Sequence, residues 1–247
     1  MGREVLEFVI RKTTNINVVE GFVNWLEFRI FVYKIFVMAD NYLGKKMEDH
    51  LRAAAPAKRT TPSLSRLLER NRSHRAYDSS FIVREDQLRR IVDVATKVPS
   101  ARNQQVLRFR MVLSDEAEKV LPHIRLGGAL PELHLPRAGE EPNAFIVICS
   151  TVAVSHYVSV DLGIVAQSML LQAVEIGLNG ICIGAFDAKA VKQELSLPYD
   201  PVLVLAIGRG KDNIRLKPIA EDDNHAYYRE DGIHYVPKVR VEDLILK

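Results

Sequence analysis

The chain has 247 residues, of which 47% are hydrophobic and 26% are charged, as is typical of a soluble globular protein with one large or two small domains. The net charge is +3, and the excess lies in residues 1–60, which carry 10 basic and 7 acidic side chains; residues 61–247 carry 24 of each. Residues 61–247 therefore have no net charge, which argues against nucleic-acid binding, because that function requires a basic face.

The two cysteines, Cys149 and Cys182, both lie in apolar, strand-like runs. We expect buried, reduced thiols in a cytoplasmic protein, because neither a disulfide framework nor a zinc-type spacing is present. The seven histidines are scattered along the sequence, so no bound metal is expected.

Residues 1–60 differ from the rest of the sequence. Residues 16–38 are apolar and aromatic, but four charged side chains interrupt them (Glu20, Glu27, Arg29 and Lys34). These charges argue against a membrane-spanning helix, and no signal-peptide pattern is present. An amphipathic helix that docks on the main domain or on a partner is expected in preference to one that anchors the protein to a membrane. Met38 and Met47 leave open a downstream natural start, and residues 53–61 resemble a linker.

Residues 61–247 are expected to form the main domain. The first helix should begin with Thr61 as N-cap and Pro62 in its first turn. A second helix is predicted over residues 85–98, where apolar residues recur at i, i+3, i+4 and i+7. An alternating strand over 107–113, a short helix over 115–121 and a long surface excursion over 122–142 should follow.

The second half of the domain contains the most apolar segments. Residues 143–150 predict a strand buried on both faces, and residues 158–176 predict a core or dimer-interface helix that ends at Gly177. Further strands are expected over 180–184 and 202–207, with a helix over 188–195. The final forty residues are expected to be irregular until a short helix over 241–245.

Several common catalytic motifs are missing. There is no phosphate-binding loop of the Walker type, no G-x-G-x-x-G fingerprint after a strand and no nucleophile elbow. A hydrolase or a metalloenzyme is therefore disfavoured.

Residues 98–109 (VPSARNQQVLRF) join the second helix to the first strand. Pro99 limits continuation of the helix. Ser100, Asn103, Gln104 and Gln105 offer neutral donors and acceptors, which suit the edge of a flat polar heterocycle better than a phosphate or a metal. The alternative is an ordinary polar connection.

Three other patches carry candidate binding residues. Residues 72–75 (RSHR) could bind a phosphate or neutralise a developing anion, or form a solvated charge run. Residues 183–186 (IGAF) are small enough for a ring to lie against the backbone, or form a tight turn. Residues 208–211 (GRGK) could add a second phosphate contact, or form a solvated loop.

In order and spacing, these patches resemble the FMN-dependent nitroreductase family. The family's R-x-S-x-R-like motif corresponds to residues 72–75, and its A-P-S-x-x-N-x-Q-P-W-x-F motif corresponds to residues 98–109. Its long core helix followed by G-L-x-x-x-x-I-G-A-F is similar to residues 161–186. The resemblance covers residues 62–247 and does not extend to residues 1–60.

The resemblance implies an α+β fold with a central mixed β-sheet flanked by helices, in an intertwined homodimer that binds FMN. By analogy, Arg72, Ser73 and Arg75 would hold the phosphate, the ribityl chain and the N1/O2 edge of the ring. Gly184 and Ala185 would lie near N5, and Arg209 and Lys211 would complete the phosphate site. Residues of the loop would reach the flavin bound mainly to the other subunit: Pro99, Ser100, Ala101 and Asn103.

The implied activity is a ping-pong transfer of reducing equivalents from NADH or NADPH to a nitroaromatic, quinone or similar acceptor. The flavin carries this chemistry, so no catalytic side chain is required. Val106 and Leu107 replace the usual Pro-Trp and alter the packing of the loop. Alternatives are azoline oxidation, reductive dehalogenation or flavin cleavage by a related flavin enzyme, and a non-catalytic flavin-binding protein.

Overall fold

The computed structural model describes residues 29–34, 45–46, 62–127 and 135–246. The chain divides into two units, Met1–Thr60 and Thr61–Lys247. In the first unit, residues 29–34 are helical, and Ile30, Phe31 and Tyr33 are exposed. The rest of the helix expected over residues 16–38, and the expected linker over 53–61, lie outside the described residues.

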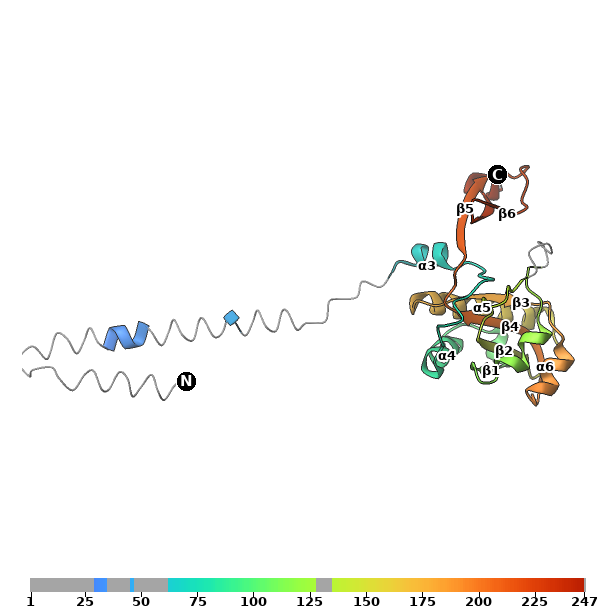
Figure 1. Cartoon of the computed structure of the whole chain (residues 1–247), viewed down its shortest axis with the longest axis horizontal. Coiled ribbons are helices and arrows are strands. Elements are labelled where there is room, and N and C mark those ends of the chain that lie inside the picture. The colour runs from blue at the N-terminus through green and yellow to red at the C-terminus, as the bar shows by residue number, and fades with distance from the viewer. Residues whose placement is uncertain (1–28, 35–44, 47–61, 128–134, 247) are drawn as a thin grey trace, which may run out of the picture. The chain divides into compact units, whose positions relative to one another are not determined.

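The second unit is built on a four-stranded sheet with the strand order β1-β2-β4-β3 (Figure 1). The strands are β1 (Leu107–Val112), β2 (Ala144–Ser150), β4 (Asp200–Gly208) and β3 (Asn179–Ile183). The predicted α+β class with a central sheet between helices is confirmed. All three strand pairs are antiparallel. The sequence predicted a mixed sheet. The parallel pairing is an isolated bridge between Ser73 and Gly180 on β3.

The two central strands alternate between two apolar clusters, one on each face of the sheet. Phe145 and Val147 of β2 pack in one cluster with Val191 of α6 (Ala188–Glu194). Ile146 and Ile148 pack in the other, against α4 (Glu85–Val92) and α5 (His156–Glu175). Every residue of β2 is buried. This two-sided burial explains the continuous apolar run that predicted the strand.

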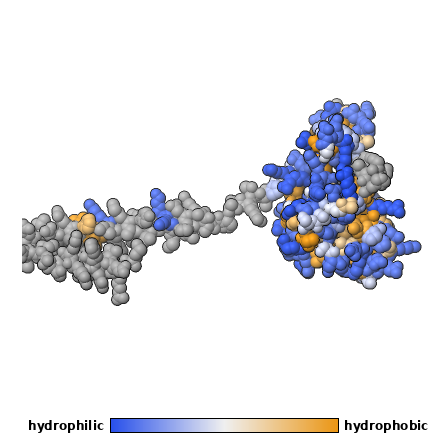
Figure 2. Space-filling view, in the orientation of Figure 1, coloured by the Kyte–Doolittle hydropathy of each residue, from blue (hydrophilic) through white to orange (hydrophobic). Residues whose placement is uncertain are grey.

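Helix α5 is the longest helix among the described residues. Ser155 caps its first turn, and Gly177 follows its end with a φ of +83°, a backbone conformation that glycine adopts without steric cost. By length and composition α5 could cross a membrane. One side of α5, which includes Val165 and Met169, belongs to the core cluster, while Tyr157 and Val160 are exposed. Apolar patches also remain on the largely hydrophilic surface of this unit (Figure 2).

Two predicted helix boundaries and one predicted helix were wrong. Helix α3 spans Leu64–Arg70, and its N-cap is Ser63, whose hydroxyl accepts the Arg66 N–H, so Pro62 precedes the helix. The second predicted helix ends at Val92 and continues only as a 3₁₀ turn at Asp93–Thr96. The helix expected over 115–121 is replaced by 3₁₀ turns at Ala117–Lys119 and Leu121–His123, and Pro122 lies in the first turn of the second.

The two cysteines differ in environment. Cys149 on β2 is buried, and burial raises the pKa of its thiol to about 11. Cys182 on β3 is exposed, so the prediction of two buried thiols was wrong for this residue. The reason is that β3 is an edge strand, and Cys182 points to the opposite face from Ile181 and Ile183, which join the core.

The expectation that the final forty residues are irregular was also wrong. They form a three-stranded sheet of β5 (Asn213–Ile219), β7 (Ile233–Val239) and β6 (Tyr228–Glu230), followed by α7 (Val241–Leu244). Asp231 and Gly232 join β6 to β7 with φ values of +50° and +75°. Asp-Gly between two strands is a strong hairpin signal, so the sequence contained evidence for this turn.

The carboxylate of Asp212 joins the residues after α3 to the C-terminal sheet. It accepts the backbone N–H groups of Arg75 and Ala76 at 2.6 and 3.0 Å, and the Arg229 guanidinium at 3.1 Å. The buried imidazole of His74 lies 3.9 Å from the same carboxylate. Burial lowers the pKa of His74, and Arg75 and Arg72 lower it further, although Asp212 acts in the opposite direction.

This lowered pKa predicts a pH-dependent stability. The unfolded chain takes up a proton on His74 near pH 6.5, whereas the folded protein does so only at lower pH. The stabilisation present above pH 6.5 is therefore lost as pH falls toward the folded pKa, by at most about 1.4 kcal/mol per pH unit. Thermal melts from pH 7.5 to 5.5 should show a shallower decline for His74→Gln. The control His225→Gln, at an exposed residue, should keep the wild-type slope.

Candidate functional site

The loop between α4 and β1 has an unusual backbone. Ser100 precedes a 3₁₀ turn at Ala101–Asn103, and Arg102, Asn103 and Gln105 have φ values of +52°, +55° and +49°. Non-glycine residues adopt this left-handed conformation infrequently, and clusters of them occur at functional sites. The observation favours a ligand-contacting loop over an ordinary connection.

A buried carboxylate holds this loop in place. Asp161 of α5 is 6% exposed, and its two oxygens lie 2.9 and 3.1 Å from the Ala101 nitrogen, whose N–H they accept. The Ser100 hydroxyl also accepts the Gln105 N–H at 3.2 Å. Sequence reasoning did not single out Asp161. Its signal was an acidic residue in the interior of a largely apolar helix.

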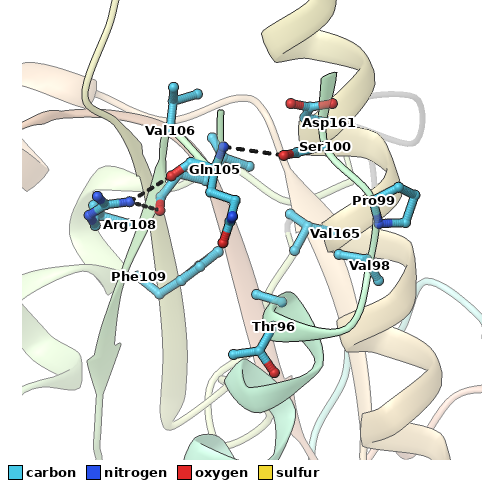
Figure 3. A pocket seen from close by; sticks show the side chains of 12 residues that line it. Thr96, Val98, Pro99, Ser100, Gln105, Val106, Arg108, Phe109, Asp161 and Val165 are labelled. Carbon is cyan, nitrogen blue, oxygen red and sulfur yellow. Dashed lines mark hydrogen bonds between the residues drawn. The ribbon is translucent and has the colours of Figure 1, made fainter. Parts of the chain in front are cut away.

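A pocket lies beside the loop (Figure 3). Ser100, Gln105 and Asp161 supply polar groups, while Phe109 and Val165 supply apolar walls. The pocket has a volume of about 160 Å³. This volume is below the roughly 300–1,000 Å³ of typical cofactor pockets. This pocket alone is therefore smaller than a typical cofactor requires.

The residues after α3 lie beside β3. Ser73 bridges Gly180, and the His74 N–H donates to the Gly180 carbonyl at 3.3 Å. Gly180 permits close packing, because a Cβ there would lie 2.7 Å from the Ala206 carbonyl oxygen. The predicted group of Arg72, Ser73 and Arg75 is thus positioned by backbone contacts to an edge strand.

The two arginines of this group have different surroundings. One Nη of Arg72 donates to the Leu68 carbonyl at 2.7 Å, but its Nε is buried without a hydrogen-bond partner among the described residues. Burial lowers the pKa of Arg72. The Arg75 guanidinium donates to the Ser73 carbonyl at 3.0 Å and lies 5.6 Å from the centre of the Tyr227 ring. An orphaned guanidinium nitrogen suits an additional acceptor such as an anionic ligand.

Gly184 and Ala185 follow the end of β3 and are exposed. No atom other than those of its chain neighbours lies within 4 Å of the position that a Cβ of Gly184 would occupy. The space beside the Gly184 backbone is therefore open. The Ala185 carbonyl accepts the Arg125 N–H at 2.9 Å, which fixes its orientation.

Arg209 and Lys211 follow β4, and their backbone adjoins residues 76–78. The Lys211 N–H donates to the Ala76 carbonyl, and the Asp78 N–H donates to the Arg209 carbonyl. Both side chains already have partners. The Arg209 guanidinium lies 3.8 Å from the Asp78 carboxylate and 4.1 Å from the centre of the Phe81 ring, while Lys211 lies 3.1 Å from Glu140. A phosphate there would compete with these ion pairs.

The candidate residues form two groups at opposite edges of the sheet. The 72–75, 184–185 and 209–211 segments lie at or near the β3 side, which we call the β3-edge group. Residues 99–105 precede β1 at the other edge, and we call them the β1-edge group. Three strand spacings separate the edge strands, or about 14 Å. One chain does not bring the two groups together.

Two solved structures have folds similar to that of this chain. A variant of the FMN and NADPH-dependent nitroreductase NfnB from Sphigopyxis sp. strain HMH is 20% identical, with a TM-score of 0.53 and coverage of 61% of this chain and 89% of that one. An FMN-containing structure from Exiguobacterium sibiricum 255-15 is 18% identical, with a TM-score of 0.52 and coverage of 63% and 92%.

These similarities establish the fold. No curated protein matches the sequence. The model of the nitroreductase family matches residues 68–209, which is more than half of the chain and includes most of both edge groups. The chain therefore belongs to the nitroreductase family.

Proposed function

We propose that this protein is an FMN-dependent oxidoreductase that passes reducing equivalents from NADH or NADPH to a nitroaromatic, quinone or similar acceptor by a ping-pong cycle. The observation that carries the proposal is the arrangement along β3. Ser73 bridges Gly180 near one end of the strand, within the segment that carries Arg72 and Arg75, and the open backbone of Gly184 follows the other end.

The β3-edge group suits FMN in shape and charge. Gly184 lies four positions after Gly180, a distance of about 13 Å in an extended strand. FMN has the same general form, because it is a flat ring with a phosphorylated side chain and is therefore elongated and anionic at one end. The buried, unpartnered Nε of Arg72 would donate to the phosphate or ribityl oxygens, and Ser73 and Arg75 would supply further donors.

The protein itself would bind the flavin, orient it and polarise its ring. FMN, when bound, would supply the redox chemistry by accepting a hydride and releasing electrons to the acceptor. Arg72 and Arg75 would stabilise negative charge near the pyrimidine edge of the ring. The exposed backbone at Gly184 and Ala185 would let the ring lie close to the chain, since neither residue has a bulky side chain.

A homodimer would complete this site. The β1-edge group and β3 lie at opposite edges of the sheet. In this proposal Pro99, Ser100, Ala101 and Asn103 would reach the flavin of the neighbouring subunit. The exposed Tyr157 and Val160 lie on α5, which also carries Asp161. Burying these apolar side chains against a second copy would favour association. We also propose a cytoplasmic location for this dimer.

Purified protein should be yellow, or should become so with added FMN. Anaerobic NADPH or NADH should then bleach the flavin absorbance, and a nitroaromatic or quinone should restore it. Protein that binds no FMN would contradict the proposal. Bound FMN that neither nucleotide reduces would instead favour a non-catalytic flavin protein, and product formation without NAD(P)H would favour another flavin reaction.

An intersubunit complementation experiment tests which flavin the loop serves. One variant combines Ser100→Leu with Asn103→Leu, and the other is Arg72→Ala; each homodimer should lose FMN and activity. A heterodimer purified through two different tags would contain one intact site, with the loop from one subunit and Arg72 from the other. Its activity should be about half that of the wild type.

The same experiment includes an alternative outcome and a control. If the loop serves the flavin of its own subunit, the heterodimer contains no intact site and should be inactive. Ser114→Leu provides a matched control, because it places the same side chain at an exposed turn after β1. This control should retain FMN, so that a general effect of added apolar surface is recognised.

A further inference from the structure

A short antiparallel ladder connects residues 123–125 with residues 185–187. The Arg125 N–H donates to the Ala185 carbonyl at 2.9 Å, and the Asp187 N–H donates to the His123 carbonyl at 2.8 Å. Ile124 and Phe186 are the paired residues between these bonds. The ladder places the backbone of residues 123–125 directly beside the segment that we assign to the flavin ring.

The ladder also decides which side chains face outward. Ile124 is 8% exposed, and Phe186 packs against the same apolar cluster. Because side chains alternate along paired strands, His123 and Arg125 point to the opposite side, as do Ala185 and Asp187. These four residues line an open cavity of about 510 Å³ together with Pro122 and Phe186.

Arg125 supplies a positive charge to this cavity. Its side chain is exposed, and within the described residues its guanidinium has no hydrogen bond or ion pair. The nearby carboxylate of Asp187 caps the start of α6, where its Oδ1 accepts the N–H groups of Lys189 and Ala190, and among the described residues it forms no ion pair with Arg125. Bonding to those two N–H groups holds the pKa of Asp187 low. Arg125 is therefore available to an anion that enters from solvent.

We propose that Arg125, with His123 beside it, is a specificity-determining subsite that binds an anionic group of a substrate reacting at the flavin. The inference rests on the proposed function, because that function places Ala185 against the ring. The anion would be a phosphate of the reduced nicotinamide nucleotide or a carboxylate of the acceptor. A guanidinium binds either oxyanion through paired donors.

The test measures binding to the full-length protein by titration calorimetry, with and without FMN. NADP⁺ and nicotinamide riboside compare a phosphorylated nucleotide with one that lacks phosphate. In the second arm, 4-nitrobenzoate and nitrobenzene compare a carboxylated with an uncharged acceptor. Arg125→Gln removes the charge, Arg125→Lys restores it, and Arg215→Gln removes an exposed charge from β5 as a control.

We expect Arg125→Gln to raise the Kd of NADP⁺, of 4-nitrobenzoate or of both about tenfold or more. The Kd of FMN and of the uncharged ligands should not change, and Arg125→Lys should recover part of the loss. An effect on NADP⁺ alone assigns the subsite to the donor, and an effect on 4-nitrobenzoate alone assigns it to the acceptor.

Three results would overturn the subsite. The first is that Arg125→Gln leaves the Kd of both anions unchanged, and the second is that the wild-type protein does not prefer the anionic ligands. The third is that Arg125→Gln loses FMN affinity to the same extent, which would make Arg125 a flavin ligand. The FMN titration of the wild type reports separately on the proposed function. Protein that binds NADP⁺ through Arg125 but never binds FMN would retain the anion subsite and lose the flavin assignment.

Discussion

The pairing of β2 with β4 is the constraint on which the other features of this domain depend. Both strands are covered on both faces, by α4 and α5 on one side and by α6 and its neighbouring turns on the other. Polar groups that bind a ligand cannot be placed in these faces without a large desolvation cost. They therefore occur at the two sheet edges, where backbone and polar side chains remain accessible.

At the β3 edge, three segments that are distant in sequence are held together by backbone hydrogen bonds. Ser73 and His74 contact Gly180, while Ala76 contacts Lys211. Asp212 adds a charged acceptor that receives two N–H groups of the 72–76 segment and the Arg229 guanidinium. The cations of this edge thus depend on the C-terminal sheet for their position.

At the β1 edge, the loop over residues 99–105 has a strained backbone and is held by one carboxylate. Three left-handed non-glycine residues within 102–105 each cost conformational energy, on the order of 1 kcal/mol. The bond from Ala101 to Asp161 secures the loop to α5, on which Tyr157 and Val160 are exposed. In a homodimer, the same helix would position the loop and join the subunits, so flavin binding and association would be coupled.

The sequence by itself determined the order and type of the main elements, because β2, β4 and α5 have strong apolar patterns. It also located the motifs at residues 72–75, 98–109 and 183–186 that indicated the family. It did not predict the N-cap of α3, the end of α4, the role of Asp161 or the exposure of Cys182. It also missed the C-terminal sheet, although Asp231-Gly232 signalled a hairpin. Only the tertiary structure decided that residues 99–105 and Gly184 lie at opposite edges, since strand order depends on long-range pairing that no local pattern encodes.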